Sequence, residues 1–274
     1  MAAIEPVTAG GLDLPAIGLG TMRQQGPGCV DLVEAALAEG YRHLDTARKY
    51  GNEAEVGEGL RRSSVPRDEV LVTTKLAPDE LAAADVRPAT EESLRTLGLD
   101  HVDLLLIHWP SPTVPIEETL GEFAALRDAG LTRAIGVANL PSTPLREAAA
   151  GFDLATDQVE YHPYLAQPAV LTACRDLGLA LTAYCPLARA GDLLGDAVLV
   201  SLARTHDRTP AQIALRWLVQ QPGVVAIPGA SSVPHLRENL DVHGFRLADD
   251  EVARIDQLAR GGRVVDPPHA PEWD

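Results

Sequence analysis

Short apolar runs rich in Val, Ile and Leu recur along the chain, and each is followed by a polar turn and then by a stretch with helical periodicity. Most of these runs are continuously apolar, which is typical of strands buried on both faces in a parallel sheet covered by helices. Successive runs end about 20 to 45 residues apart, which leaves room for a crossover helix each time. The pattern predicts eight strands, at residues 16–20, 41–45, 70–75, 102–108, 133–139, 156–161, 180–186 and 224–229.

Helix boundaries are also visible between the predicted strands. Thr209 stands where an N-cap is expected, Pro210 occupies the first helical position, and Gln212 completes a capping box. Gly98 follows the run EESLRTL at a position typical of a helix C-terminus.

The regular alternation of strands and helices favours one closed (β/α)8 TIM barrel, a single domain over residues 1–274, over a two-domain chain. An N-terminal β-hairpin with its turn at Gly10 and Gly11 is expected before the barrel, extra helices are expected near the C-terminus, and residues 261–274 are expected to be irregular. A glycine-rich stretch at 18–23, GLGTMR, lacks the third glycine of a dinucleotide fingerprint, so a Rossmann fold is not favoured.

Composition narrows the possible partners. The chain has 274 residues, of which 46% are hydrophobic, so it has ample material for a core. Its formal net charge of −16 argues against nucleic acid or anionic membrane as a partner, because binding those surfaces requires a basic patch. The N-terminus lacks the pattern of a secretory signal and no run approaches a membrane span, so we expect a cytoplasmic protein. The cysteines are three in number and widely spaced, which predicts neither disulfides nor a metal site: Cys29, Cys174 and Cys185.

Four polar residues fall at or just after three consecutive predicted strand ends: Asp45, Tyr50, Lys75 and His108. Lys75 is conspicuous because 21 of the 23 basic side chains are Arg and only Lys49 and Lys75 are Lys. An ammonium is compact and has a tunable pKa, whereas a guanidinium stays charged. The C-terminal ends of barrel strands meet at one mouth, so these four side chains are expected to converge there.

Together, the four residues could transfer a proton. An ammonium near a phenol can lower the phenol's pKa by roughly 1 to 3 units, which would make Tyr50 a usable general acid. Asp45 would hold the Lys75 ammonium, and His108 would orient and polarise a carbonyl oxygen. Each residue taken alone has an ordinary structural explanation, such as a cap, a turn or a strand terminus. Their joint placement favours a site.

The chain resembles the aldo-keto reductases, in particular prokaryotic members with a short C-terminal tail, similar to the 2,5-diketo-gluconate reductase-like enzymes. The resemblance covers nearly the whole length and is carried by motifs in a specific order. These motifs are GLGT (18–21), GYRHLDTA (40–47), YGNE (50–53), TTK (73–75), LLLIHWP (104–110), GVAN (136–139), QVEYHP (158–163), AYCPL (183–187), IPGASS (227–232) and REN (237–239).

The resemblance implies a carbonyl reductase that uses a nicotinamide cofactor, with the four polar residues as its catalytic set. By the same resemblance, Asn139 and Gln158 bind the carboxamide, Tyr184 stacks on the nicotinamide ring, and Thr21 and Asp45 approach its ribose. A turn after the last strand leads into a helix that begins near residue 234 and is suited to a phosphate. The full set of expected cofactor-binding residues is Gly20, Thr21, Asp45, Asn139, Gln158, Tyr184, Cys185, Leu187, Gly229, Ala230, Ser231, Ser232, His235, Glu238 and Asn239.

The chain departs from the family pattern at the expected phosphate end. Gly229, Ala230 and His235 stand where many members have Lys, Ser and Arg, which recognise the 2′-phosphate of NADPH. Arg237 could compensate, so NADP(H) is slightly favoured and NAD(H) remains possible. Ala138 and Cys185 each replace a usual Ser, which removes two hydroxyls near the cofactor.

We expect reversible reduction of aldehydes or ketones to alcohols by a monomer acting on a small-molecule carbonyl substrate. The substrate pocket is expected to be lined by Met22, Tyr50, His108 and Trp109, and the short tail is expected to leave its mouth relatively open. Two alternatives remain at this point. One is a Schiff-base lyase that uses Lys75 as an amine nucleophile, and the other is a catalytically weak nicotinamide-binding regulatory subunit.

Overall fold

The structure, a computed structural model, describes residues 4–274. Its main sheet has eight parallel strands whose order in space follows their order in the chain. All eight predicted strands are present, although several are shorter than expected. They are β3 (Leu19–Gly20), β4 (His43–Asp45), β5 (Leu71–Leu76), β6 (Val102–Ile107), β7 (Thr132–Ala138), β8 (Leu154–Glu160), β9 (Ala180–Tyr184) and β10 (Val224–Ala226).

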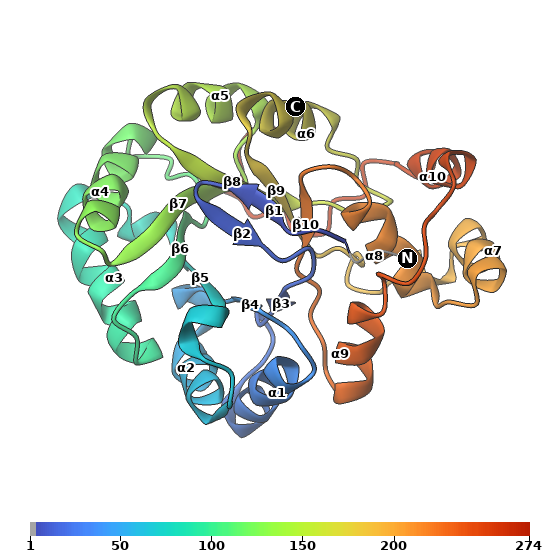
Figure 1. Cartoon of the computed structure of the whole chain (residues 1–274). Helices are drawn as coiled ribbons and strands as arrows, with labels where there is room; N and C mark the ends of the chain where they lie inside the picture. Colours follow the sequence, from blue (N-terminus) through green and yellow to red (C-terminus); the bar gives the residue numbers. More distant parts are fainter. Residues whose placement is uncertain (1–3) are drawn as a thin grey trace.

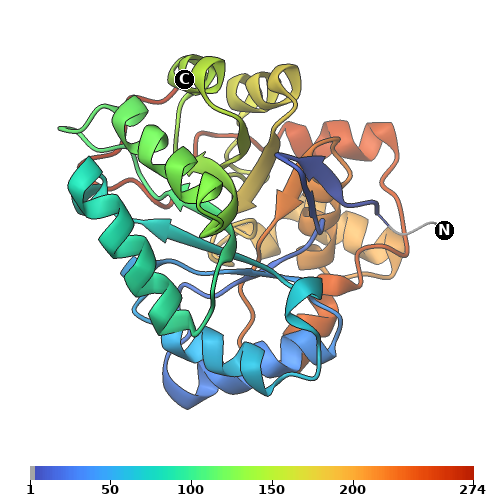
Figure 2. The ribbon, with the colours of Figure 1, turned by 60° about the vertical axis from the view of Figure 1, so that its left-hand side comes forward.

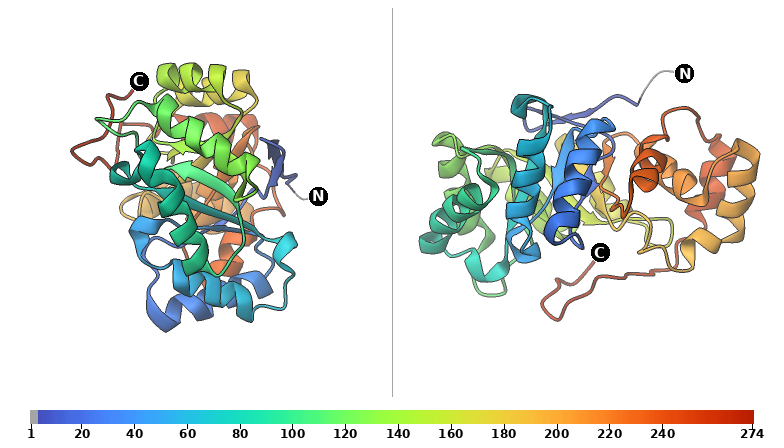
Figure 3. Two further views of the ribbon diagram at one scale, coloured as in Figure 1. Left: turned by 90° about the vertical axis from the view of Figure 1, so that its left-hand side faces the viewer. Right: turned by 90° about the horizontal axis from the view of Figure 1, so that it is seen from below.

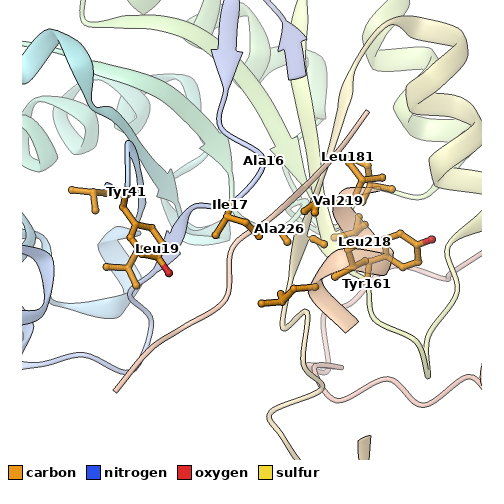
Figure 4. Close-up of a cluster of buried hydrophobic side chains, with 14 of the residues drawn as sticks. Ala16, Ile17, Leu19, Tyr41, Tyr161, Leu181, Leu218, Val219 and Ala226 are labelled. Carbon is orange, nitrogen blue, oxygen red and sulfur yellow. The ribbon is translucent and has the colours of Figure 1, made fainter. Parts of the chain in front are cut away.

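The sheet closes into a barrel where the segment before β3 meets β10. Ile17 forms a parallel bridge to Ala226, and the amide of Ala226 donates to the carbonyl of Ala16 at 2.9 Å. Figure 4 shows these residues side by side at the closing seam, among buried side chains that include Leu19 and Leu181. Closure removes the exposed edges that an open sheet would have. The predicted (β/α)8 barrel is therefore confirmed.

Helices surround the strands on the outside of the barrel (Figures 1 and 2). Two helices lie between β9 and β10, and two more follow β10, which confirms the expected extra helices near the C-terminus. The helices are α1 (Gly26–Ala38), α2 (Glu53–Arg62), α3 (Ala83–Leu97), α4 (Ile116–Asp128), α5 (Ser142–Gly151), α6 (Pro168–Leu177), α7 (Ala197–His206), α8 (Pro210–Val219), α9 (Val233–Leu240) and α10 (Asp249–Asp256).

The helix ends follow the sequence signals. Thr209 accepts a hydrogen bond from the amide of Gln212, and the Gln212 side chain accepts one from the amide of Thr209, so the predicted capping box of α8 is confirmed. Gly98 ends α3 with a φ of 68°, a left-handed conformation that glycine adopts at little cost.

The predicted hairpin consists of β1 (Val7–Ala9) and β2 (Leu12–Leu14), joined through Gly10 and Gly11 at positive φ. It covers the N-terminal end of the barrel, where Leu12 and Leu14 join a second, smaller apolar cluster with side chains from the strands. The C-terminal residues 261–274 are irregular, as expected, and run across the opposite end (Figure 3, left). The hairpin thus covers the N-terminal ends of the strands, and the tail crosses the C-terminal ends, where the candidate site lies.

Candidate active site

Consecutive strands deliver the four candidate catalytic residues to one end of the barrel. Asp45 is the last residue of β4, Lys75 is the penultimate residue of β5, and His108 directly follows β6. Tyr50 ends a short 3-10 turn, η1 (Arg48–Tyr50), that follows β4. Because these strands are parallel neighbours, their C-terminal ends bring the four side chains together, as the sequence predicts.

Lys75 and Asp45 form an ion pair at the centre of this group. The Lys75 Nζ lies 2.6 Å from Asp45 Oδ1, and the two residues are 0% and 1% exposed. The ammonium also donates to the carbonyl oxygen of Thr46 at 2.7 Å, and Asp45 Oδ2 accepts from Gln158 Nε2 at 2.8 Å. Burial lowers the pKa of Lys75, and the adjacent Asp45 carboxylate opposes that effect. The extra bonds from Thr46 and Gln158 are what a buried pair of charges requires.

The Tyr50 and His108 rings lie side by side above this pair, and both side chains are half-buried. Their ring centroids are 5.5 Å apart in an edge-to-face arrangement. The Lys75 Nζ is 5.2 Å from the centroid of the Tyr50 ring. The phenol, the imidazole and the ammonium therefore share one small volume at the mouth.

The protonation states differ in one respect from the sequence-based expectation. Burial, followed by the nearby Asp45 carboxylate, raises the pKa of Tyr50 well above 10, whereas an ammonium-lowered pKa was expected. Burial is the larger cause because it disfavours the charged phenolate, and the Lys75 ammonium is itself paired with Asp45. Burial and the Lys75 charge lower the pKa of His108 to about 3. Near neutral pH the site therefore holds a protonated phenol beside a neutral imidazole.

The two residues expected at the nicotinamide carboxamide, Asn139 and Gln158, and the residue expected to stack on the ring, Tyr184, also lie at this end of the barrel. The Tyr184 hydroxyl donates to Asn139 Oδ1 at 2.8 Å, and Asn139 Nδ2 donates to the His108 carbonyl at 2.9 Å. Gln158 uses its amide nitrogen on Asp45, and within the described part of the chain its Oε1 accepts no hydrogen bond. A second N–H of Asn139 and the Oε1 of Gln158 thus offer one donor and one acceptor, which complement a carboxamide.

The segment that follows β3 lies against the same group. Thr21 is fully buried and donates to the Asp45 carbonyl from both its amide, at 3.0 Å, and its hydroxyl, at 2.9 Å. A Cβ added at Gly20 would lie 2.7 Å from the Ile227 carbonyl oxygen, so a side chain there would collide with the chain after β10. Gly20 and Thr21 therefore fix the backbone beside Asp45.

The residues expected at a cofactor phosphate gather at the start of α9. Ser232 is the N-cap and accepts from the amide of His235 at 3.4 Å, while Ser231 Oγ lies 3.0 Å from His235 Nδ1. Asn239 donates back to the Gly229 carbonyl at 3.3 Å, and Gln24 holds the Ala230 carbonyl at 2.8 Å. The loop is thus pinned at both ends, with its amides at a helix N-terminus.

Two charged residues of α9 have other partners. Glu238 accepts from the Thr209 hydroxyl at 2.6 Å, so this side chain is bonded to the cap of α8. Arg237, the cation that could compensate for the missing basic residues, instead pairs with both Glu39 oxygens at 2.7 and 2.8 Å. At the expected phosphate end the chain therefore offers backbone amides and the Ser231 and Ser232 hydroxyls.

The loop after β9 carries the other two candidate cofactor residues, Cys185 and Leu187. Both are half-buried, and Cys185 has a φ of 47°. The next three residues, at 188–190, also have positive φ although none is glycine. Such consecutive left-handed residues are strained, and strained backbone of this kind often occurs where a loop serves a ligand.

The substrate side contains residues that sequence reasoning missed. Met22 is 45% exposed, and Trp109 is buried at 8% because the C-terminal tail covers it. The rings of His269 and Trp273 pack edge-on against Trp109, with centroids 5.7 and 6.1 Å away. The mouth is therefore less open than expected. Aromatic residues in an otherwise irregular, proline-containing tail were the available clue.

Among residues 4–274, no helix is long and apolar enough to cross a membrane. Over the same residues, no group of three or more His, Cys, Asp or Glu side chains could hold a metal ion.

Comparison with known proteins agrees with this geometry. The model of the Aldo/keto reductase family matches residues 16–260. An aldo-keto reductase of Mycolicibacterium vanbaalenii is 41% identical over 91% of this chain and 90% of its own length. Methylglyoxal reductase DkgB of Escherichia coli O157:H7 is 39% identical over 95% and 99% of the two chains. A crystal structure assigned to 2,5-diketo-D-gluconic acid reductase B is 42% identical and superposes with a TM-score of 0.96 over 99% and 98% of the two chains.

The chain therefore belongs to the aldo/keto reductase family. It is an oxidoreductase, since its relatives are named as aldo-keto, methylglyoxal and diketogluconate reductases. The family uses nicotinamide cofactors and small-molecule carbonyl substrates, and the amide pair at the mouth fits the carboxamide of such a cofactor.

Proposed function

We propose that the protein reduces aldehydes or ketones to alcohols with NAD(P)H and that Tyr50 is the general acid. The observation that carries this proposal is the buried Lys75 and Asp45 pair, held by Gln158 beneath the phenol of Tyr50. A bound nicotinamide cofactor supplies the hydride that reduces the carbonyl carbon. The residues of the chain supply the proton and the orientation.

Tyr50 protonates the carbonyl oxygen of the substrate as negative charge develops there. Its raised pKa keeps the phenol protonated in the free site, so the proton is present when the substrate arrives. Lys75 lies close enough to stabilise the phenolate that forms, while Asp45 keeps the ammonium charged and in place. His108, neutral at working pH, can donate a hydrogen bond to the same oxygen without adding charge.

The mode of Lys75 binding disfavours the Schiff-base alternative. A nucleophilic lysine must present a free amine to the substrate. Lys75 is fully buried, and its ammonium donates to a carboxylate and to a backbone carbonyl.

We keep the slight preference for NADP(H), with NAD(H) as the second possibility. The helix N-terminus at Ser231 and Ser232 supports binding of a cofactor phosphate but does not distinguish the two cofactors, so the preference rests on Arg237 alone. The pairing of Arg237 with Glu39 weighs against a strong preference. We also propose a cytoplasmic monomer, in which the catalytic residues all come from one chain.

Replacing Tyr50 by Phe tests the mechanism. Oxidation of NADPH and NADH is followed with a panel of carbonyls that includes methylglyoxal and 2,5-diketo-D-gluconate, after which relatives are named. Loss of the phenol proton should lower kcat/KM by about 10² to 10⁴-fold. Cofactor affinity, measured by fluorescence titration, should stay within about twofold, since Tyr50 provides no binding charge.

Tyr161→Phe is the matched control, because the Tyr161 ring packs against Trp217 of α8 and its hydroxyl bonds to Gln221, just after that helix. It should keep near wild-type activity. Equal activity of wild type and Tyr50→Phe, or no cofactor oxidation by wild type with any carbonyl, would contradict the proposal.

A further inference from the structure

The C-terminal tail, residues 261–274, is attached to the functional end of the barrel at several points. The amide of Gly262 donates to the carbonyl of Tyr164, in the loop after β8, at 3.0 Å. Near the other end of the tail, Asp274 accepts from the amide and the hydroxyl of Ser142, at the start of α5. Figure 3 shows the tail crossing this end of the barrel as an extended segment without helix or strand. The tail is therefore attached to this end of the barrel near both of its own ends.

Glu160 connects the tail to the barrel itself. It is the last residue of β8 and is fully buried. Its Oε1 accepts from the amide of Val264 at 2.7 Å and lies 2.9 Å from His162 Nε2, and its Oε2 accepts from the amide of Val265 at 2.8 Å. A buried carboxylate is costly unless its oxygens are hydrogen-bonded. Two of the three groups that satisfy Glu160 belong to the tail.

The tail residues on either side of this attachment pack against one another and against Trp109. Arg263 stacks on the ring of Trp273 at 3.6 Å, and Trp273 and His269 pack against Trp109. Trp109 directly follows His108 in the chain. The Glu160 contact thus fixes the tail only a few residues before the side chains that reach the substrate side.

We propose that Glu160 is a positioning residue that anchors the tail through the amides of Val264 and Val265 and thereby places His269 and Trp273 against Trp109. It acts on the substrate through the tail and takes no part in proton transfer. The effect on substrates rests on the proposed function, whereas the anchoring itself does not. Loss of the anchor should loosen the tail around residues 262–266, while its contacts with Tyr164 and Ser142 and the fold of the barrel remain.

Glu160→Gln tests the anchor directly. A neutral amide can accept from one tail N–H, but its NH₂ group faces the second donor, so at least one bond is lost. Hydrogen exchange followed by mass spectrometry should show residues 262–266 exchanging at least about tenfold faster than in wild type. Tryptophan emission should shift to longer wavelength as Trp109 and Trp273 gain solvent. Glu147→Gln, the same change at an exposed position on α5, should leave both measurements unchanged.

A second variant changes the tail partner and avoids removing a buried charge from the barrel. Val265→Pro deletes the N–H that binds Glu160 Oε2, while Val265→Ala keeps that N–H and serves as its control. Val265→Pro should reproduce the faster exchange of Glu160→Gln, and Val265→Ala should not. Combining Val265→Pro with Glu160→Gln should add little, because both changes break the same contact.

Kinetics give a readout that a merely structural role would not produce. With the anchor lost, KM for the reduced carbonyls should rise severalfold while kcat changes less, because the proton donor is intact and the mouth is looser. Unchanged exchange at 262–266 in both Glu160→Gln and Val265→Pro would overturn the proposal. If wild type reduces no carbonyl, the proposed function fails, and the exchange measurements still decide whether Glu160 anchors the tail.

Discussion

Two buried acids at the functional end of the barrel have opposite surroundings. Asp45, inside the mouth, pairs with the ammonium of Lys75 and accepts from Gln158. Asp157 precedes Gln158 in β8 and is equally buried, yet among the described residues its Oδ1 accepts only a long 3.5 Å bond from the amide of Leu140, and its Oδ2 has no hydrogen-bond partner. Burial raises the pKa of Asp157 well above its ordinary value. The interior of the mouth stabilises the charged pair of Asp45 and Lys75, whereas the outer face of β8 keeps the Asp157 carboxyl neutral.

The two environments differ because side chains of a barrel strand point either into the barrel or out toward the helices. Neighbouring residues of a strand point to opposite faces, so Gln158 reaches into the barrel while Asp157 points toward the helices. Inside, polar groups from several strands satisfy one another. Outside, the helices present an apolar surface, where an ionised carboxylate is unfavourable.

Breaking the charged pair should give the largest effect. In Lys75→Met the Asp45 carboxylate stays buried with Gln158 as its remaining side-chain partner, which should cost about 3 to 5 kcal/mol of unfolding free energy. Activity should fall by about 10²-fold or more, because no ammonium remains to stabilise the phenolate. Urea unfolding and kcat/KM measure the two effects.

The double variant Asp45→Asn with Lys75→Met separates stability from chemistry. It removes both charges, so it should recover much of the stability of wild type while remaining inactive. If Lys75→Met were as stable as the double variant, the Asp45 carboxylate would not be a buried charge that needs Lys75.

Acid should lower the free energy of unfolding through a buried histidine, His43, close to Asp45 in β4. His43 is buried in β4, its Nε2 lies 3.0 Å from Thr73 Oγ1, and burial lowers its pKa from 6.5 to about 4. The unfolded chain therefore binds a proton first, so stability present above pH 6.5 should be lost as the pH falls toward 4. The full loss corresponds to about 3 kcal/mol at 1.36 kcal/mol per pH unit.

His43→Gln removes this titration and can keep the bond to Thr73. Its unfolding free energy, measured across the same window, should fall less steeply than that of wild type. Identical slopes for the two proteins would show that His43 does not resist protonation.

Asp157→Asn should change the free energy of unfolding less than protonation of His43 does, and in the opposite direction. Since the folded pKa is raised above the unfolded value of 3.8, the unfolded chain loses its proton first and stability decreases as the pH rises above 3.8. Asparagine has no such loss, so the variant should be more stable than wild type at neutral pH by about 1 to 3 kcal/mol. Thermal melts at acidic and neutral pH check this, and an advantage that does not grow with pH would contradict it.

The sequence predicted the barrel and the convergence of the candidate residues because both depend on local patterns. Continuous apolar runs gave the strands, and parallel strand ends placed Asp45, Lys75 and His108 side by side. The raised pKa of Tyr50 could not be predicted, because it depends on how deeply the folded chain buries the phenol and on how close the Asp45 carboxylate lies. The tail could not be placed either, since its position depends on contacts between residues about 100 apart in the chain, such as Glu160 and Val264. Irregular segments have no periodicity from which such contacts could be inferred.

The smallest effect should come from a charge pair that water reaches. Arg237 and Glu39 are 66% and 24% exposed at the side chain, so their pairing contributes only about 0.2 to 1 kcal/mol. If the 2′-phosphate of NADPH binds near the start of α9, Glu39 competes with it for Arg237. Glu39→Gln should then tighten NADPH by about 1.5 to 5-fold and leave NADH unchanged, as measured by fluorescence titration. Glu34→Gln changes the same charge on α1 and should have no such effect; equal tightening in both variants would indicate a general field effect, and no tightening in either would place the phosphate away from Arg237.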